Sequence, residues 1–67
     1  MMQINLNGER RELPEHIHLG GLIDQLSLPR QRIALELNGI VIRRADWPEI
    51  LINDGDRIEV VHFVGGG

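Results

Sequence analysis

The sequence contains no cysteine and no lysine among its 67 residues, and its aromatic side chains are limited to Trp47 and Phe63. Without cysteine there can be no disulfide, no cysteine-based zinc site and no thiol nucleophile. With so few aromatics, the core has to be aliphatic.

A basic surplus and long apolar runs are missing too. Ten acidic residues outnumber seven basic ones, giving a formal net charge of −3. Nucleic-acid binding requires clustered cationic side chains, so we expect no nucleic-acid partner. No stretch approaches the roughly 20 apolar residues that cross a bilayer, and residues 1–5 do not resemble a signal peptide. We therefore expect a cytoplasmic protein with no membrane partner.

The side chains do not suggest an enzyme active site. His16 and His18 stand in a predicted loop, and a zinc or copper site would need further ligands in a defined geometry. Ser27 is the only hydroxyl side chain, and no neighbouring base marks it as activated. Gly20-Gly21 has neither the spacing nor the lysine of a phosphate-binding loop. We predict no catalytic residue, no metal site and no cofactor bound by this chain.

Two Asn-Gly pairs, Asn7-Gly8 and Asn38-Gly39, predict two β-hairpins. Both central residues of a type I′ turn need positive φ, which Asn-Gly tolerates well, and each pair is flanked by apolar residues at strand spacing. Residues 9–13 are polar, as expected for an edge strand. The four strands predicted around these pairs cover residues 2–6, 9–13, 33–37 and 40–42.

Between the hairpins, Leu19, Leu22, Ile23 and Leu26 follow the spacing of one helix face. Gly20-Gly21 weakens this predicted helix, as does the lack of a capping side chain at its start. We expect a short helix that is held mainly by burial of its leucine face.

The last third of the chain predicts a helical turn over residues 45–50, capped by Asp46 with Pro48 near its start. A turn at residues 53–56 then precedes a last strand over residues 57–63. A single amphipathic helix must bury its apolar face against a sheet, which makes this an α+β protein. A β-grasp arrangement satisfies this order. We predict a mixed sheet of about five strands with its first and last strands adjacent at the centre, and one main helix packed on one face. The domain would cover residues 1–63, followed by a flexible tail of residues 64–67.

The tail is Val64-Gly65-Gly66-Gly67. Three consecutive glycines arise by chance on the order of once in 3,000 positions at average glycine usage. Glycine lets a backbone enter a narrow channel, and four extended residues reach roughly 13–14 Å. We therefore predict that Val64, Gly65 and Gly66 insert into a partner and present the carboxylate of Gly67, which needs activation by ATP. The alternative is a frayed terminus or a leftover linker.

Val61 and Phe63 should point away from the core if the last strand keeps its period of two, because Ile58 and Val60 occupy the core-facing positions. Two large apolar side chains beside the tail would form a partner-docking patch. Alternatively, Phe63 bends over the edge of the core.

The chain resembles the ThiS family of thiamine-biosynthesis sulfur carriers, which are ubiquitin-like, over essentially its whole length. The Arg-x-x-Trp segment and the Val-Gly-Gly-Gly ending are the more specific parts of the resemblance, whereas the Gly-Asp turn and last strand are shared by ubiquitin-like proteins generally. The departures are Gly20-Gly21 in the helix and Arg43 where a proline is common. The residues that carry the resemblance are Leu37-Asn38-Gly39, Arg44 and Trp47, residues 54–61, and residues 64–67.

This resemblance implies a β-grasp fold and a role as co-substrate rather than enzyme. An adenylyltransferase similar to ubiquitin-activating enzymes (the ThiF type) would use ATP and magnesium to convert the Gly67 carboxylate to an acyl-adenylate. Sulfur relayed from cysteine desulfurase would then leave a thiocarboxylate on Gly67. Thiazole synthase (the ThiG type) would take that sulfur into the thiazole ring of thiamine.

Three other functions remain open at this point. The chain could carry sulfur for molybdopterin or another pathway, although such carriers are usually longer and lack the Trp47 segment. It could be a ubiquitin-like protein modifier joined through Gly67 to a target lysine. It could also be a β-grasp module that binds RNA or nucleotides, against which the acidic balance argues.

Overall fold

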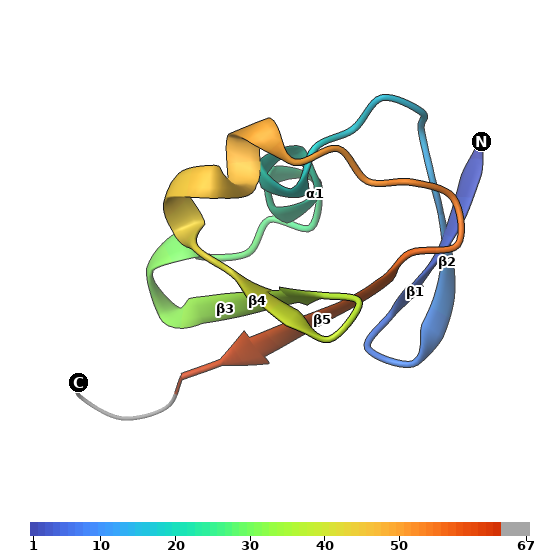
Figure 1. Cartoon of the computed structure of the whole chain (residues 1–67). Coiled ribbons are helices and arrows are strands. Elements are labelled where there is room, and N and C mark those ends of the chain that lie inside the picture. The colour runs from blue at the N-terminus through green and yellow to red at the C-terminus, as the bar shows by residue number, and fades with distance from the viewer. Residues whose placement is uncertain (64–67) are drawn as a thin grey trace.

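The computed structural model describes residues 1–63, which form a five-stranded mixed sheet with its helices on one face (Figure 1). This confirms the predicted β-grasp fold; the predicted tail, residues 64–67, lies outside the described residues. The strands are β1 (Met2–Leu6), β2 (Glu9–Leu13), β3 (Ile33–Leu37), β4 (Ile40–Ile42) and β5 (Arg57–His62). The helices are α1 (Leu19–Gln25) and the 3-10 helices η1 (Arg30–Arg32) and η2 (Arg44–Glu49).

The strand order is β2-β1-β5-β3-β4, so the first and last strands lie side by side at the centre, as predicted. β1 and β5 run parallel, with Asn5 opposite Arg57 and Leu6 opposite Ile58. The other three strand pairs are antiparallel. β5 is thus the strand that joins the two hairpins into one sheet.

Both Asn-Gly turns adopt the predicted left-handed conformation, with φ of 50° at Asn7, 52° at Asn38 and 86° at each following glycine. Their side chains also bind β5. Asn7 Oδ1 accepts a hydrogen bond from Val60 N at 2.8 Å, and Asn7 Nδ2 donates to Val60 O at 3.5 Å. Asn38 Oδ1 accepts from Arg57 N at 2.9 Å. Each hairpin turn therefore holds a different point of β5.

Helix α1 buries the face that the leucine spacing predicts, since Leu19, Leu22 and Ile23 have no exposed surface. Leu26 is the C-cap and packs against the core from its edge. The N-cap, His18, makes no side-chain capping bond, as expected. No helix within residues 1–63 is long and apolar enough to cross a membrane. Burial rather than capping holds α1 in place.

The predicted capping role of Asp46 in the turn before the last strand is wrong. Helix η2 begins at Arg44 with Arg43 as its N-cap, and Asp46 N already donates to Arg43 O at 2.9 Å. Pro48 consequently lies near the end of η2. The position of Trp47 explains the earlier start, because its ring is almost completely buried and its Nε1 donates to Ile42 O at 3.0 Å. The Arg44 guanidinium lies 5.8 Å from the centre of the same ring, in cation–π geometry.

Gly20 lies where α1 meets η2. A methyl group at Gly20 would lie 3.6 Å from Arg30 Nη2 and 3.7 Å from Pro48 N, which is ordinary van der Waals contact. At Gly21 the same group would lie 3.2 Å from Ile17 Cγ1, which is tighter than usual. The two helix glycines thus differ in the room left for a side chain.

We predict that Gly20→Ala raises the free energy of unfolding by up to about 1 kcal/mol, because alanine forms helix better than glycine and Gly20 has space for it. Gly21→Ala should gain less, because Ile17 must move. Urea unfolding of both variants tests this. A larger gain for Gly21→Ala would contradict it.

We also predict that Asn7→Gly lowers the free energy of unfolding by about 1–3 kcal/mol. Glycine accepts the positive φ of the turn, so the loss would come from leaving Val60 N–H, which is partly buried, without its acceptor. Asn7→Asp keeps an acceptor for that N–H and should lose less. Equal losses for the two variants in urea unfolding would show that the bond to Val60 is not the cause.

Candidate functional site

The carboxyl end of β5 is the part of the fold from which the predicted tail leaves. Phe63 is the last described residue, and the predicted site residues Val64, Gly65, Gly66 and Gly67 lie outside the described residues. β5 leaves the middle of the sheet on the side away from the N-terminus (Figure 1). The surroundings of Val61, His62 and Phe63 therefore define what a partner meets at the base of the tail.

Val61 and Phe63 both lie on the outer face of the sheet, away from the helices. Their exposed fractions are 42% and 55%, whereas Ile58 and Val60, which precede them on β5, are buried. Phe63 N donates to Arg32 O at 2.8 Å, so the backbone continues beside the residue that precedes β3. The alternative in which Phe63 bends over the core is therefore wrong. The docking role of the two side chains remains a prediction.

An acidic pair lies next to them on the same face. The register places Glu36 of β3 directly opposite Glu59 of β5, and Val61 opposite Ala34. Like charges opposite one another destabilise a sheet, and neither glutamate forms an ion pair within the described residues. Val41 of β4 stands opposite Glu36 and is also exposed. We call this surface the outer patch and define it by Glu36, Val41, Glu59, Val61 and Phe63.

A hollow of about 280 Å³ lies on the other side of β5, between the sheet and the segment that follows α1. Four aliphatic side chains form most of its wall, and the polar side chains of Asn7, Arg11 and His62 complete it. We call it the β5 hollow. Its lining residues are Leu6, Asn7, Arg11, Leu26, Leu28, Val60 and His62.

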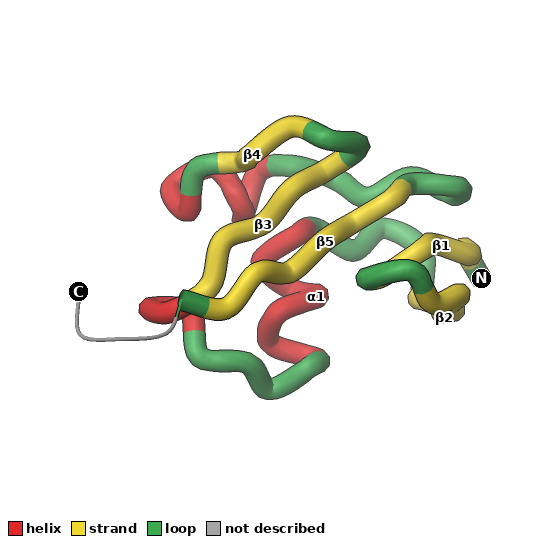
Figure 2. The backbone as a smooth tube through the Cα atoms, turned by 90° about the horizontal axis from the view of Figure 1, so that it is seen from below, coloured by secondary structure: helices red, strands yellow, loops and turns green. Residues whose placement is uncertain are grey.

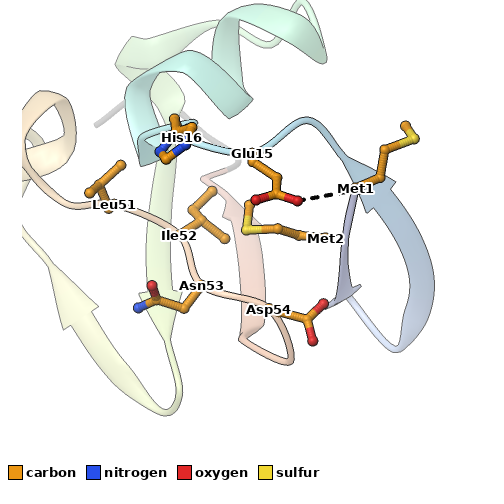
Figure 3. A pocket seen from close by; sticks show the side chains of 8 residues that line it. All are labelled: Met1, Met2, Glu15, His16, Leu51, Ile52, Asn53 and Asp54. Atoms are coloured by element: carbon orange, nitrogen blue, oxygen red, sulfur yellow. Dashed lines mark hydrogen bonds and ion pairs between the residues drawn. The ribbon is translucent and has the colours of Figure 1, made fainter.

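Another hollow, of about 500 Å³, lies elsewhere, among the start of β1, the loop before α1 and the loop before β5 (Figure 3). The N-terminal amino group lies 3.5 Å from Glu15 Oε2 there, and His16 has a φ of 64°. This hollow adjoins the start of β5, whereas the tail leaves from its end. It therefore belongs to a different part of the molecule from the candidate site.

The three histidines do not come together. His16 lines the hollow of Figure 3, His18 forms an isolated β-bridge with Leu51, and His62 lines the β5 hollow. Within residues 1–63 no three histidine, aspartate or glutamate side chains are grouped so that they could hold a metal ion. Ser27, with a φ of 57°, serves the chain reversal after α1.

Sequence reasoning found Val61 and Phe63 of the outer patch from the alternation along β5 alone. It missed the Glu36–Glu59 pair and the β5 hollow. Both depend on the register between strands that are distant in the sequence. The only signal available in advance was the Asn38-Gly39 turn, which sets the register of β3 against β4 but not against β5.

Comparison with known proteins gives consistent matches along the whole chain. The model of the ThiS family matches residues 4–67. The crystal structure of the thiamine biosynthesis protein ThiS from Geobacter metallireducens superposes with a TM-score of 0.86 at 29% identity, covering 98% of this chain and 100% of that one. The sulfur carrier protein ThiS of Escherichia coli is 27% identical over 66 residues, covering 98% of this chain and all of that protein.

The chain also matches part of a larger protein. The thiazole synthase of Magnetococcus marinus is 38% identical over 66 residues, covering 98% of this chain, but this chain spans only about a fifth (20%) of that protein's length. The family match, by contrast, includes the described fold and extends through Gly67. The chain therefore belongs to the ThiS family.

Proposed function

We propose that this chain is a sulfur carrier in thiamine biosynthesis and that its working group is the C-terminal carboxylate of Gly67. The observation that carries the proposal is the ThiS family match from residue 4 to Gly67, which includes the three glycines. The likeness to a sulfur carrier protein over that protein's full length supports it. Within residues 1–63 no group of histidine, aspartate or glutamate side chains could hold a metal ion, and no cysteine is present.

The carboxylate must first be activated, because a carboxylate is a poor acyl donor. In the proposed cycle an adenylyltransferase of the ThiF type binds ATP and magnesium. A carboxylate oxygen of Gly67 attacks the α-phosphate, pyrophosphate leaves, and the product is an acyl-adenylate. AMP then serves as the leaving group for the incoming sulfur.

The sulfur must come from outside this chain, which has no cysteine. A persulfide supplied by cysteine desulfurase attacks the acyl carbon and displaces AMP. A second thiol on a partner then reduces the resulting acyl disulfide, which releases the thiocarboxylate on Gly67. Both thiols belong to partners, so this chain acts as a co-substrate and not as an enzyme.

Thiazole synthase is the proposed acceptor of this sulfur. Thiazole synthases that contain a region similar to almost all of this chain support the assignment. Such a region shares one polypeptide with its acceptor, and tethering raises the effective concentration of a carrier at the acceptor site. We propose that this chain likewise delivers its sulfur to a thiazole synthase, whether carrier and acceptor are separate proteins or parts of one polypeptide.

The outer patch is the proposed docking surface for the adenylyltransferase. Phe63 directly precedes Val64 and Val61 lies two residues earlier, so both exposed side chains are close in the sequence to the residues that a partner would hold. Burying a large apolar side chain is worth about 1.5–3 kcal/mol. The outer patch would thus contribute binding energy, while the glycines allow the carboxylate of Gly67 to enter the partner's active site.

We expect intact-mass analysis to show exchange of one oxygen for one sulfur on Gly67 when the chain is incubated with the adenylyltransferase, ATP, magnesium, cysteine desulfurase and cysteine. Deletion of Gly67, or one extra residue after it, should abolish the exchange because the terminal carboxylate then falls short of the reacting position or extends past it. The mass of the natural protein also tests whether Gly67 is its last residue.

Two results would contradict the carrier role. One is an unchanged mass under conditions in which the Escherichia coli carrier is converted. The other is a thiol-resistant attachment of the chain to target proteins, which would indicate a protein modifier. Transfer of the sulfur to molybdopterin synthase rather than thiazole synthase would keep the carrier role but move it to another pathway.

We predict that the double variant Val61→Ser/Phe63→Ser lowers kcat/KM for sulfur loading at least about tenfold, equivalent to about 1.4 kcal/mol of transition-state stabilisation. Ile40→Ser is the matched control, because Ile40 is also exposed but points to the other face of β4 from Val41. An equal loss in both variants, or none in the double variant, would contradict docking through the outer patch.

A further inference from the structure

Strand β5 has an open edge along its second half. β1 pairs with β5 at only two positions, ending with Leu6 opposite Ile58, and the chain then turns away at Asn7-Gly8. Figure 2 shows β1 beside the first part of β5 only, while β3 accompanies β5 along its whole length. β5 is therefore a central strand at its start and an edge strand near the tail.

The register shows which backbone groups face this open edge. Phe63 N donates to Arg32 O, and Asn38 N donates to Arg57 O at 2.7 Å. The odd-numbered residues from Arg57 to Phe63 therefore direct their backbone hydrogen bonds toward β3. In an antiparallel ladder the intervening residues direct their N–H and C=O groups to the opposite side. Ile58, Val60 and His62 consequently face the β1 side.

Two of these three residues already have partners there. Ile58 O accepts from Asn7 N at 2.9 Å. Val60 N and Val60 O both bond to the side-chain amide of Asn7, which takes the place of a further residue of β1. For His62, no hydrogen bond of the backbone N–H or C=O on this side is found among residues 1–63. Within residues 1–63, the His62 N–H donor and C=O acceptor are therefore available to another strand on this side.

The β5 hollow lies along this same edge. Leu26 and Leu28 form one wall, Val60 forms the side toward β5, and Arg11 and His62 add polar groups. The Arg11 side chain is half exposed, and its one ion pair within residues 1–63 is a loose contact of 4.0 Å with Glu9. The hollow therefore combines an apolar surface with a cation that a carboxylate could approach.

We propose that the open edge of β5 at His62 binds an extended segment of thiazole synthase as an added β-strand, with an apolar side chain in the β5 hollow and a carboxylate near Arg11. Strand addition fits because backbone hydrogen bonds supply affinity and alternate side chains supply specificity. The inference rests on the proposed acceptor and identifies how that acceptor holds the base of the tail. The positive charge of Arg11 is the reason for choosing an acidic–apolar segment.

The two proposed partners would contact different surfaces next to the end of β5. The outer patch, assigned to the adenylyltransferase, carries Glu36 and Glu59, whereas the β5 hollow carries Arg11. The charges of the two surfaces are opposite, so each suits a partner segment of a different charge. This allows the two interactions to be separated by substitution.

Arg11→Glu should weaken binding of purified thiazole synthase at least tenfold, measured by calorimetry on the full chain. Arg10→Glu is the matched control, with the same charge change on the neighbouring exposed residue of β2. Arg10 stands opposite Asn5, and Arg11 stands opposite the buried Ile4, so the two side chains lie on different faces. Arg10→Glu should change the affinity less than twofold. Thermal unfolding checks that both variants are folded.

Hydrogen exchange followed by NMR gives the second readout. The His62 amide should exchange at least tenfold more slowly in the complex with thiazole synthase than in the free chain. The proposal fails if the His62 amide exchanges equally fast in both states, or if Arg11→Glu binds as well as Arg10→Glu. No binding by the parent chain would overturn this inference together with the proposed acceptor. Sulfur loading of Arg11→Glu by the adenylyltransferase, expected at the parent rate, tests the carrier role separately.

Discussion

The pairing of β5 with both hairpins is the constraint on which the rest of this structure depends. β1 and β3 lie on either side of β5, and each hairpin turn adds an asparagine side chain that bonds to the β5 backbone, Asn7 at Val60 and Asn38 at Arg57. The buried side chains of β5, Ile58 and Val60, then face the leucines of α1. Because β5 is the last element before the tail, the same contacts that complete the fold also fix the point from which the tail leaves.

Local patterns predicted most of this fold because the relevant interactions are local. An Asn-Gly pair determines its own turn, and the spacing of Leu19, Leu22 and Ile23 determines which face of α1 is buried. The capping role of Asp46 was wrong for a tertiary reason. Burial of Trp47 and its hydrogen bond to Ile42 O decide where η2 begins, and these outweigh the preference of one exposed carboxylate for a cap.

The candidate site was predictable to a smaller extent. Alternation along β5 was enough to place Val61 and Phe63 outside the core, and their exposure follows directly. The Glu36–Glu59 pair and the open edge at His62 arise from the register of β5 against β3 and β1, which are distant in the sequence. No local pattern encodes such a register. Surfaces that assemble from several strands therefore have to be taken from the structure, even where every strand is predicted correctly.

The missing lysine and cysteine acquire a chemical meaning under the proposed cycle. An acyl-adenylate reacts readily with amines and thiols, so a chain that forms one at its own C-terminus risks acylating its own side chains. With all seven basic residues being arginine, whose guanidinium stays protonated, no side-chain amine or thiol competes with the partner's sulfur. His62, the histidine closest to Gly67 in the sequence, lines the β5 hollow rather than the outer patch. The absence of lysine and cysteine therefore keeps the activated carboxylate of Gly67 from reacting with amine or thiol side chains of its own chain.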